Sequence, residues 1–261
     1  MLPLFTLEKT IMKRIKFLDS PVDSVDIPDV LEWMSDRIET NDPGLMAVVN
    51  ANKFWLMSRD TRLRKIVNNA DLVIPEWSVV WGASWLGTPL KSYVAGVALL
   101  QAAMPWAEKK GYRPYFLGAS QNVIEILSNQ LKSEFPKLNP AGFHNGFLIT
   151  ESDYQKVREE INNSRPDMIF VAMGSPKQEY WIEENAKLLQ IPVSLGVGGS
   201  FDVLAGIKKD TPAWARGNGM EWAYRLAQEP KAYWRRYLMC NPWFVNKVIK
   251  AYFCEKLLKL T

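Results

Sequence analysis

Apolar and polar positions alternate along this chain in blocks that match the length and period of single strands and helices. Short unbroken apolar runs, such as Leu45–Val49 and Met168–Met173, are typical of strands that are buried on both faces of a sheet. Longer stretches between them carry apolar residues every three or four positions, which is typical of helices that cover a sheet. The alternation predicts an α/β fold with a Rossmann-like, mostly parallel sheet and flanking helices.

The element boundaries follow from these runs and from the turn residues between them. Pro105 lies inside one predicted helix, and Gly111 is expected to end that helix. The predicted strands are 45–49, 72–74, 113–117, 168–173 and 191–197, and the predicted helices are 29–40, 53–68, 78–86, 97–110, 122–135, 147–161 and one between the last two strands.

The segment Trp222–Thr261 differs in composition from the rest of the chain. It holds eight Lys or Arg residues, two acidic residues and nine aromatic residues, whereas the whole chain has a net charge of only +4. We therefore predict an α/β core at 1–218 and a basic, aromatic, helical C-terminal appendage at 219–261, divided near Gly217-Asn218-Gly219. Such a composition is typical of a surface that binds a membrane or a nucleic acid.

Several classes of protein are excluded or disfavoured by what the chain lacks. With two cysteines, Cys240 and Cys254, and one histidine, His144, which is expected in a loop, it has neither a disulfide framework nor a Cys/His zinc site. A reducing cytosol fits best. No apolar run has the roughly 18–20 residues that span a bilayer, and the first residues do not resemble an export signal.

Motifs for nucleotide cofactors and for metals are also missing. There is no GxGxxG after the first strand, no GxxxxGK[ST] loop, and no Asp-x-Asp pair that could hold a divalent metal on a diphosphate. We therefore predict no cofactor and no metal. Any phosphate would be neutralised by cationic side chains and helix N-termini.

Two neighbouring turns near the end of the predicted sheet carry candidate ligand-binding residues. Gln178 and Glu179 follow the strand 168–173, and Gly198, Gly199 and Asp202 follow the next strand. Open α/β sheets bind ligands at the carboxyl ends of their strands, and glycines let a ligand approach the backbone closely. Roles as turn or helix-cap residues would explain the polar residues of either turn alone. Two neighbouring turns that both carry polar side chains favour a ligand site.

Three further turn residues follow the first two strands. Asn50 and Asn52 carry amides that suit a sugar or a base, although a helix N-cap would explain one of them. Glu76 lies beside Trp77, and partial desolvation would raise its pKa and make it a better base. The spacing alone favours a simpler role for Glu76, a first-turn glutamate that interacts with the helix dipole.

Aromatic and basic side chains recur at helical spacing in two places. Trp77, Trp81 and Trp85 form a stripe that more often serves packing or an interface than sugar binding, which leaves a homo-oligomer open. In the appendage, three arginines could bind phosphate oxygens through their guanidinium groups: Arg225, Arg235 and Arg236. The alternative is that they only form the solvated basic face of a helix.

Three long motifs in this chain resemble those of the WecG/TagA/CpsF glycosyltransferases, glycosyltransferase family 26, over about Leu45 to Arg236. The motifs are MGSPKQE at Met173–Glu179, LGVGGSFDVLAG at Leu195–Gly206 and GMEWAYRLAQEPKAYWRR at Gly219–Arg236. The family's Thr-x-Asn appears here as Asn50-Ala51-Asn52, and its Pro-Asp-Gly as Pro75-Glu76-Trp77.

The resemblance implies an inverting, metal-independent enzyme that transfers an N-acetylmannosamine-type sugar or another hexose from a UDP-sugar to a polyprenyl-diphosphate-linked acceptor. Such enzymes serve cell-surface polysaccharide and teichoic acid synthesis. It implies that Glu76 is the general base, and that the appendage meets the lipid diphosphate through Arg225, Arg235 and Arg236 at the inner face of the membrane. The implied UDP-sugar contacts are Asn50, Asn52, Gly174, Gln178, Glu179, Gly198, Gly199 and Asp202.

This chain departs from the family pattern at three places. Glu76 and Trp77 replace an aspartate and a glycine, the segment Tyr93–Ala98 lacks the family's arginine and aspartate, and Asp210-Thr211-Pro212 stands where Arg-Ala-Pro is usual. A non-catalytic UDP-sugar-binding or scaffold protein of a polysaccharide assembly complex is therefore the alternative. A nucleic-acid-binding protein is disfavoured, because the residues outside the basic appendage are slightly acidic.

Overall fold

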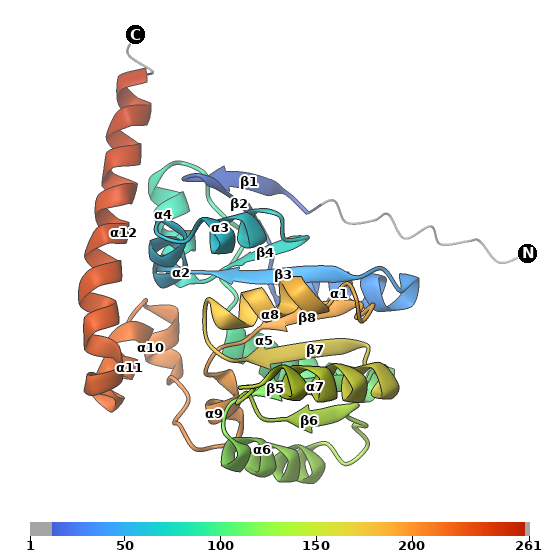
Figure 1. Cartoon of the computed structure of the whole chain (residues 1–261). Helices are drawn as coiled ribbons and strands as arrows, with labels where there is room; N and C mark the ends of the chain where they lie inside the picture. Colours follow the sequence, from blue (N-terminus) through green and yellow to red (C-terminus); the bar gives the residue numbers. More distant parts are fainter. Residues whose placement is uncertain (1–11, 259–261) are drawn as a thin grey trace, which may run out of the picture.

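A computed structural model describes residues 12–258 of the chain, and its centre is a six-stranded sheet in which every pair of neighbours is parallel (Figure 1). The strand order is β4-β3-β8-β7-β5-β6. The predicted fold class is confirmed. The strands are β3 (Gly44–Val49), β4 (Leu72–Pro75), β5 (Pro114–Gly118), β6 (Gly142–His144), β7 (Met168–Ala172) and β8 (Val193–Gly196).

Side chains on alternate strand positions divide between the two faces of the sheet. Met46 is in register with Leu72 on one side and Leu195 on the other, and Leu195 is paired in turn with Phe170. These residues belong to one core cluster, whereas their chain neighbours, such as Ala47, pack in clusters on the opposite face. Burial on both faces explains the unbroken apolar runs in the sequence.

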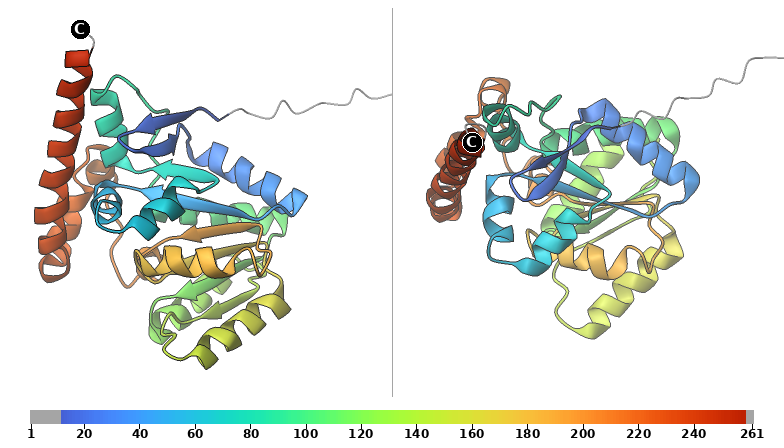
Figure 2. Two further views of the ribbon diagram at one scale, coloured as in Figure 1. Left: turned by 45° about the horizontal axis from the view of Figure 1, so that its top comes forward. Right: turned by 90° about the horizontal axis from the view of Figure 1, so that it is seen from above.

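Helices cover both faces of the sheet (Figures 1 and 2). One face is covered by α1 (Ile27–Thr40), α5 (Gly96–Lys110), α6 (Gln121–Glu134) and α9 (Ser200–Leu204). The other is covered by α2 (Ala51–Met57), α3 (Thr61–Asn68), α4 (Trp77–Trp85), α7 (Glu151–Ser164) and α8 (Lys177–Asn185). As predicted, α5 contains Pro105 and ends at Gly111, whose φ is +75°.

The predicted single helix over 53–68 is wrong, because the segment forms α2 and α3. Asp60 separates them as the N-cap of α3, and its Oδ1 accepts a hydrogen bond from the backbone N–H of Leu63 at 2.9 Å. The Tyr180 hydroxyl donates to the other oxygen of Asp60. An aspartate that satisfies the first turn of a new helix ends the previous one, although the apolar period continues across the break.

Three short strands and one boundary also differ from the sequence prediction. An antiparallel hairpin, β1 (Arg14–Phe17) and β2 (Ser20–Asp23), precedes the sheet, and β6 includes His144, which the sequence suggested was a loop residue. Helix α7 begins at Glu151, four residues after the predicted start, because the Thr150 side chain caps it in a capping box with Asp153.

The C-terminal segment is helical, as expected, and packs against the core. It consists of α11 (Glu221–Gln228) and the long α12 (Pro230–Leu258), and α10 (Ala213–Gly217) precedes it. Phe244 of α12 is buried against Phe17 and Phe54, at ring-centroid distances of 6.0 and 5.9 Å. Figures 1 and 2 show α12 beside α2 and α4, across the edge of the sheet where the strands end.

Candidate active site

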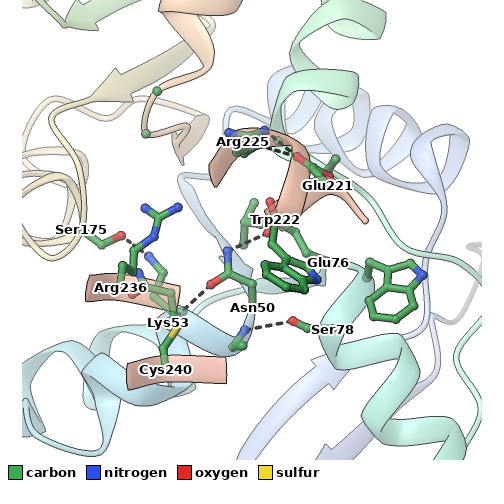
Figure 3. A pocket seen from close by; sticks show the side chains of 18 of the residues that line it. Asn50, Lys53, Glu76, Ser78, Ser175, Glu221, Trp222, Arg225, Arg236 and Cys240 are labelled. Atoms are coloured by element: carbon green, nitrogen blue, oxygen red, sulfur yellow. Dashed lines mark hydrogen bonds and ion pairs between the residues drawn. The ribbon is translucent and has the colours of Figure 1, made fainter. Parts of the chain in front are cut away.

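A cavity of about 730 Å³ lies at the carboxyl edge of the sheet. The turns after four neighbouring strands, β4, β3, β8 and β7, form its floor, and residues of α11 and α12 form its opposite wall (Figure 3). The cavity therefore lies where open parallel sheets bind ligands, and it is lined by both the core and the appendage.

Glu76 and Asn50 are joined at the centre of this cavity. The Asn50 amide nitrogen donates to Glu76 Oε2 at 2.6 Å, while Asn50 Oδ1 accepts from the backbone N–H of Lys53 at 2.9 Å. Asn50 is thus the N-cap of α2 and also a partner of the carboxylate. Glu76 is the N-cap residue of α4 but makes no side-chain capping bond, so its carboxylate is directed to the cavity instead.

Several charges and dipoles act on the Glu76 carboxylate. Burial raises its pKa most, and the negative charge of Glu221 raises it further. The Asn50 hydrogen bond, the positive charge of Arg225 and a hydrogen bond from the backbone N–H of Gly96 oppose this rise. The net effect is a raised pKa, which makes the ionised group a stronger base than a free glutamate.

Two arginines of the appendage line the cavity, and they differ in the side chains that they contact. Arg225 is paired with Glu221, with Nη2 at 2.5 Å and Nε at 2.9 Å from Glu221 Oε1. Arg236 lies over the rings of Tyr233 and Tyr237, and forms no ion pair with the side chains that the structure describes. Arg236 is therefore the cation of this wall whose charge no carboxylate offsets.

A buried polar network supports the wall formed by the β7 turn. Lys53 Nζ donates to Ser175 Oγ at 2.6 Å and to Glu179 Oε1 at 2.5 Å. Gln178 donates to Glu179 Oε1 at 2.8 Å and accepts from the backbone N–H of Gly198 at 3.0 Å. Glu179 thereby orients the lysine and the glutamine, and Gln178 connects the turns after β7 and β8.

The structure brings most of the predicted site residues together, but not all of them. Glu179 lies behind the cavity wall, Asp202 lies on α9 with one carboxylate oxygen 4.0 Å from Lys208 Nζ, and Arg235 lies over the ring of Trp234. These three are not among the residues that line the cavity. Those that do line it are Asn50, Asn52, Glu76, Gly174, Gln178, Gly198, Gly199, Arg225 and Arg236.

Other lining residues were not singled out from the sequence. Glu221 and Trp222 lie within the third motif, so the motif itself could have pointed to them. Ser175 lies within the first motif, which could likewise have pointed to it. Lys53 carried no such signal, because its role depends on a contact with Ser175, which is far away in the chain.

Two features are absent from the part of the chain that the structure describes. Within residues 12–258, no group of three or more His, Cys, Asp or Glu side chains is arranged to hold a metal ion. None of the helices in that range combines the length and the apolar character needed to cross a membrane.

Comparison with known proteins places this site in a family. A profile described as the glycosyl transferase WecG/TagA/CpsF family matches residues 15–257. A Bacillus spizizenii protein named N-acetylglucosaminyldiphosphoundecaprenol N-acetyl-beta-D-mannosaminyltransferase is 32% identical over 240 residues, which cover 92% of this chain and 90% of that protein. Proteins of the same name from Bacillus subtilis and Staphylococcus aureus are 31% and 33% identical, over 79% and 72% of each chain.

The family profile spans the sheet, the cavity and nearly all of the appendage, and the three motifs lie within it. The expected resemblance is confirmed: this chain belongs to the WecG/TagA/CpsF family of glycosyltransferases.

Proposed function

We propose that this enzyme transfers an N-acetylmannosamine-type sugar or another hexose from a UDP-sugar to a sugar linked to a polyprenyl diphosphate, with inversion and without a metal. The names of the relatives, which specify an N-acetylmannosaminyl group and a diphosphoundecaprenol-linked acceptor, support this choice of substrates. The observation that carries the proposal is Glu76, a carboxylate inside the cavity whose pKa is raised and which Asn50 and Gly96 hold in place.

In the proposed reaction, Glu76 accepts the proton of the acceptor hydroxyl. The hydroxyl oxygen forms a bond to the anomeric carbon of the donor as the bond between that carbon and the UDP oxygen breaks. Attack from the face opposite UDP inverts the anomeric centre. Because Asn50 and Gly96 donate to the carboxylate, its orientation is fixed before the substrates bind.

The other lining residues have binding roles in this proposal. The turns at Gly174 and Gly198–Gly199, together with Gln178, contact the UDP-sugar, since their backbone is accessible from the cavity. Arg236 meets a diphosphate, because its charge is not already offset by a carboxylate. Glu221 already offsets the charge of Arg225, so we do not assign Arg225 to the diphosphate. Its role in this proposal is to stabilise the ionised form of the Glu76 carboxylate through its positive charge.

The proposal includes the division into a core at 1–218 and an appendage at 219–261 that binds the lipid diphosphate and the membrane. The enzyme would act in the cytoplasm, peripherally at the inner face of the cell membrane, where UDP-sugars and the headgroup of the lipid acceptor meet. The basic residues of α12 support this placement.

The experiment that tests the proposal is UDP release by the purified protein from a panel of UDP-sugars, with a polyprenyl-diphosphate-linked N-acetylglucosamine acceptor and with EDTA. Acceptor-dependent release in EDTA is expected, and it would identify the donor. Release that is abolished by EDTA and restored by a divalent cation would contradict metal independence.

The alternative of a non-catalytic UDP-sugar binder is favoured by one observation, the absence of the family's arginine and aspartate in Tyr93–Ala98. It predicts that UDP-sugar binds, as measured by calorimetry, but that no acceptor in the panel supports UDP release.

The role of Glu76 has a direct test. Glu76→Gln keeps the shape and the Asn50 contact but cannot accept a proton, so turnover should fall by roughly 10²–10⁴-fold. UDP binding, measured by calorimetry, should be unchanged. Near-normal turnover in this variant would reject Glu76 as the base.

A further inference from the structure

Helix α4 carries a ladder of three tryptophans that begins in the cavity and ends at the surface. Trp77 and Trp81 are stacked, with ring centroids 6.5 Å apart and planes 15° apart, and Trp81 lies 5.5 Å from Trp85. Trp77 and Trp81 line the cavity, whereas Trp85 does not, and 54% of its surface is exposed. The three rings therefore form one continuous aromatic path out of the site.

We propose that this ladder binds the hydrocarbon chain of the lipid-diphosphate acceptor, and that it guides the chain from the cavity to the surface along α4, beside α12. The inference rests on the proposed function, because it needs an acceptor with a long apolar chain. It adds a subsite for that chain, with Trp77, Trp81 and Trp85 as its contacts.

The ladder begins at the place where the acceptor must react. Trp77 is the residue after Glu76, so a sugar hydroxyl at the Glu76 carboxylate lies beside the first rung. A diphosphate and a long chain must then leave the cavity in some direction. The side of Lys53, Ser175 and Gln178 is polar and closed by buried hydrogen bonds, whereas the α4 side is apolar.

Helix α12 provides the facing apolar wall. Val245 and Phe244 of α12 line the same cavity as Trp81, and Val248 packs against Gly82, where an added Cβ would lie 3.2 Å from Val248 Cγ2. Figure 2 shows α4 beside the C-terminal half of α12. This contact between Gly82 and Val248 is closed, so a chain that follows the ladder would run along the surface of α4 beside it.

The composition of α4 favours a hydrocarbon as the occupant. The helix WSVVWGASW contains no charged residue and is apolar on all sides, yet its last tryptophan lies at the surface. A sugar chain would need polar groups beside the rings, but the Ser84 hydroxyl is already bonded to the Val80 carbonyl at 2.9 Å. The other serine of the helix, Ser78, is likewise occupied, because its hydroxyl oxygen accepts a hydrogen bond from the backbone N–H of Ala51. A row of aromatic rings suits an apolar chain.

The test compares two acceptors that share the sugar diphosphate but carry either a long polyprenyl chain or a short, water-soluble alkyl chain. Trp85→Ala, made in the full chain, removes the outer rung and leaves the cavity residues in place. We expect KM for the long-chain acceptor to rise roughly tenfold, as for the loss of one large aromatic contact. KM for the short-chain acceptor and KM for the UDP-sugar should not change.

Two further variants serve as controls. Trp85→Phe keeps an aromatic ring and should recover most of the affinity for the long-chain acceptor. Trp214→Ala removes another exposed tryptophan, 63% exposed and outside the cavity lining, and should affect neither acceptor. An equal loss of both acceptors in Trp85→Ala, or no loss of either, would overturn the proposal.

The outcomes separate this inference from the proposed function. If the wild-type protein turns over neither acceptor, the proposed function fails before the ladder is tested. If both are used and Trp85→Ala instead converts a dimer to a monomer in sedimentation, with equal effects on the two acceptors, the ladder is a subunit interface and not a lipid track.

Discussion

The pairing of Asn50 with Glu76 gives one asparagine two tasks. Its carbonyl oxygen caps α2 through the backbone N–H of Lys53, and its amide nitrogen donates to the carboxylate of Glu76. The cap thus fixes which side of the amide faces the carboxylate. The sequence suggested a cap or a ligand-binding role for Asn50, and the structure shows that the cap is what aims the amide into the cavity.

The first prediction concerns the pH dependence of kcat/KM. Glu76 must be ionised to act as a base, so the rate should fall as pH decreases through its raised pKa. Glu221→Gln removes a negative charge that raises this pKa, so the acid limb should move to lower pH. Asn50→Ala removes a hydrogen bond that lowers it, so the limb should move to higher pH. Shifts in the same direction would contradict the assignment.

The second prediction concerns the buried Lys53–Glu179 pair. Lys53→Met leaves Glu179 buried without its cation, and breaking such a pair by removing one partner costs about 3–5 kcal/mol of unfolding free energy. Denaturant unfolding measures this change. Arg62→Met, which breaks an exposed pair with Glu183 and Glu184, is the matched control and should have little effect.

At the scale of elements, the sequence predicted the strands better than the breaks between helices. Runs such as Met168–Ala172 can be recognised as strands in the sequence, because burial on both faces of the sheet requires an apolar residue at every position. The break at Asp60 was missed because its cause, the cap and the Tyr180 contact, lies partly in a segment far away in the chain. The hairpin of β1 and β2 was missed because its strands mix polar and apolar residues, whereas β4, which also has four residues, is apolar throughout.

In the candidate site, too, the sequence could not predict the residues whose roles depend on contacts with distant segments. Gln178, at a strand end, was predicted because topology brings parallel strand ends together. The role of Glu76 as a base was predicted only from the family resemblance, because its spacing alone favoured a first-turn glutamate. Lys53 could not be predicted, since its position in the first turn of α2 matters only through Ser175 and Glu179. Asp202 and Arg235 lie outside the cavity lining, and their roles stay predictions.

The third prediction concerns Gly219, which joins α10 to α11. A Cβ at this position would lie 2.3 Å from the ring of Trp77, and the φ of Gly219 is +69°. Gly219→Ala should therefore displace α11 from the cavity and lower kcat/KM on the order of a hundredfold, as for a misplacement of about 1 Å. Hydrogen exchange of α11 should increase.

A matched control separates the clash from the backbone strain. Gly87 has a nearly identical φ of +72°, but an added Cβ would meet nothing within 4 Å. Gly87→Ala should therefore lower stability by about 1–2 kcal/mol without loss of turnover. Equal losses of activity in both variants would show that the contact between Gly219 and Trp77 does not position the appendage.

At the scale of the whole molecule, α12 combines a buried face with an exposed apolar and basic surface. Cys240, Phe244 and Val248 are buried against the core. Up to Cys254, where the exposure of α12 is described, its large exposed apolar residues are Trp234, Leu238, Met239, Val245, Ile249 and Phe253. An exposed apolar stripe on a basic helix is typical of a helix that lies on an anionic membrane.

The fourth prediction tests this surface. Charge reversal at Lys231, Arg235 and Lys250 should abolish co-sedimentation with anionic vesicles, because each basic residue contributes about 1 kcal/mol near such a surface. Reversal at Lys109 and Lys132, which lie on α5 and α6, is the control and should leave binding unchanged. Binding by the first variant that equals the wild type would refute a membrane role for α12.

The position of α12 in the chain has a consequence for biosynthesis. All strands of the sheet precede Ser200, whereas Arg225 and Arg236 belong to the last helices described. During translation the domain folds from its N-terminal side, so the sheet and the Glu76 turn can form while the wall opposite them has not yet been made. A nascent chain would thus hold the Glu76 carboxylate in an open groove, and would complete the enclosure only once α12 has left the ribosome.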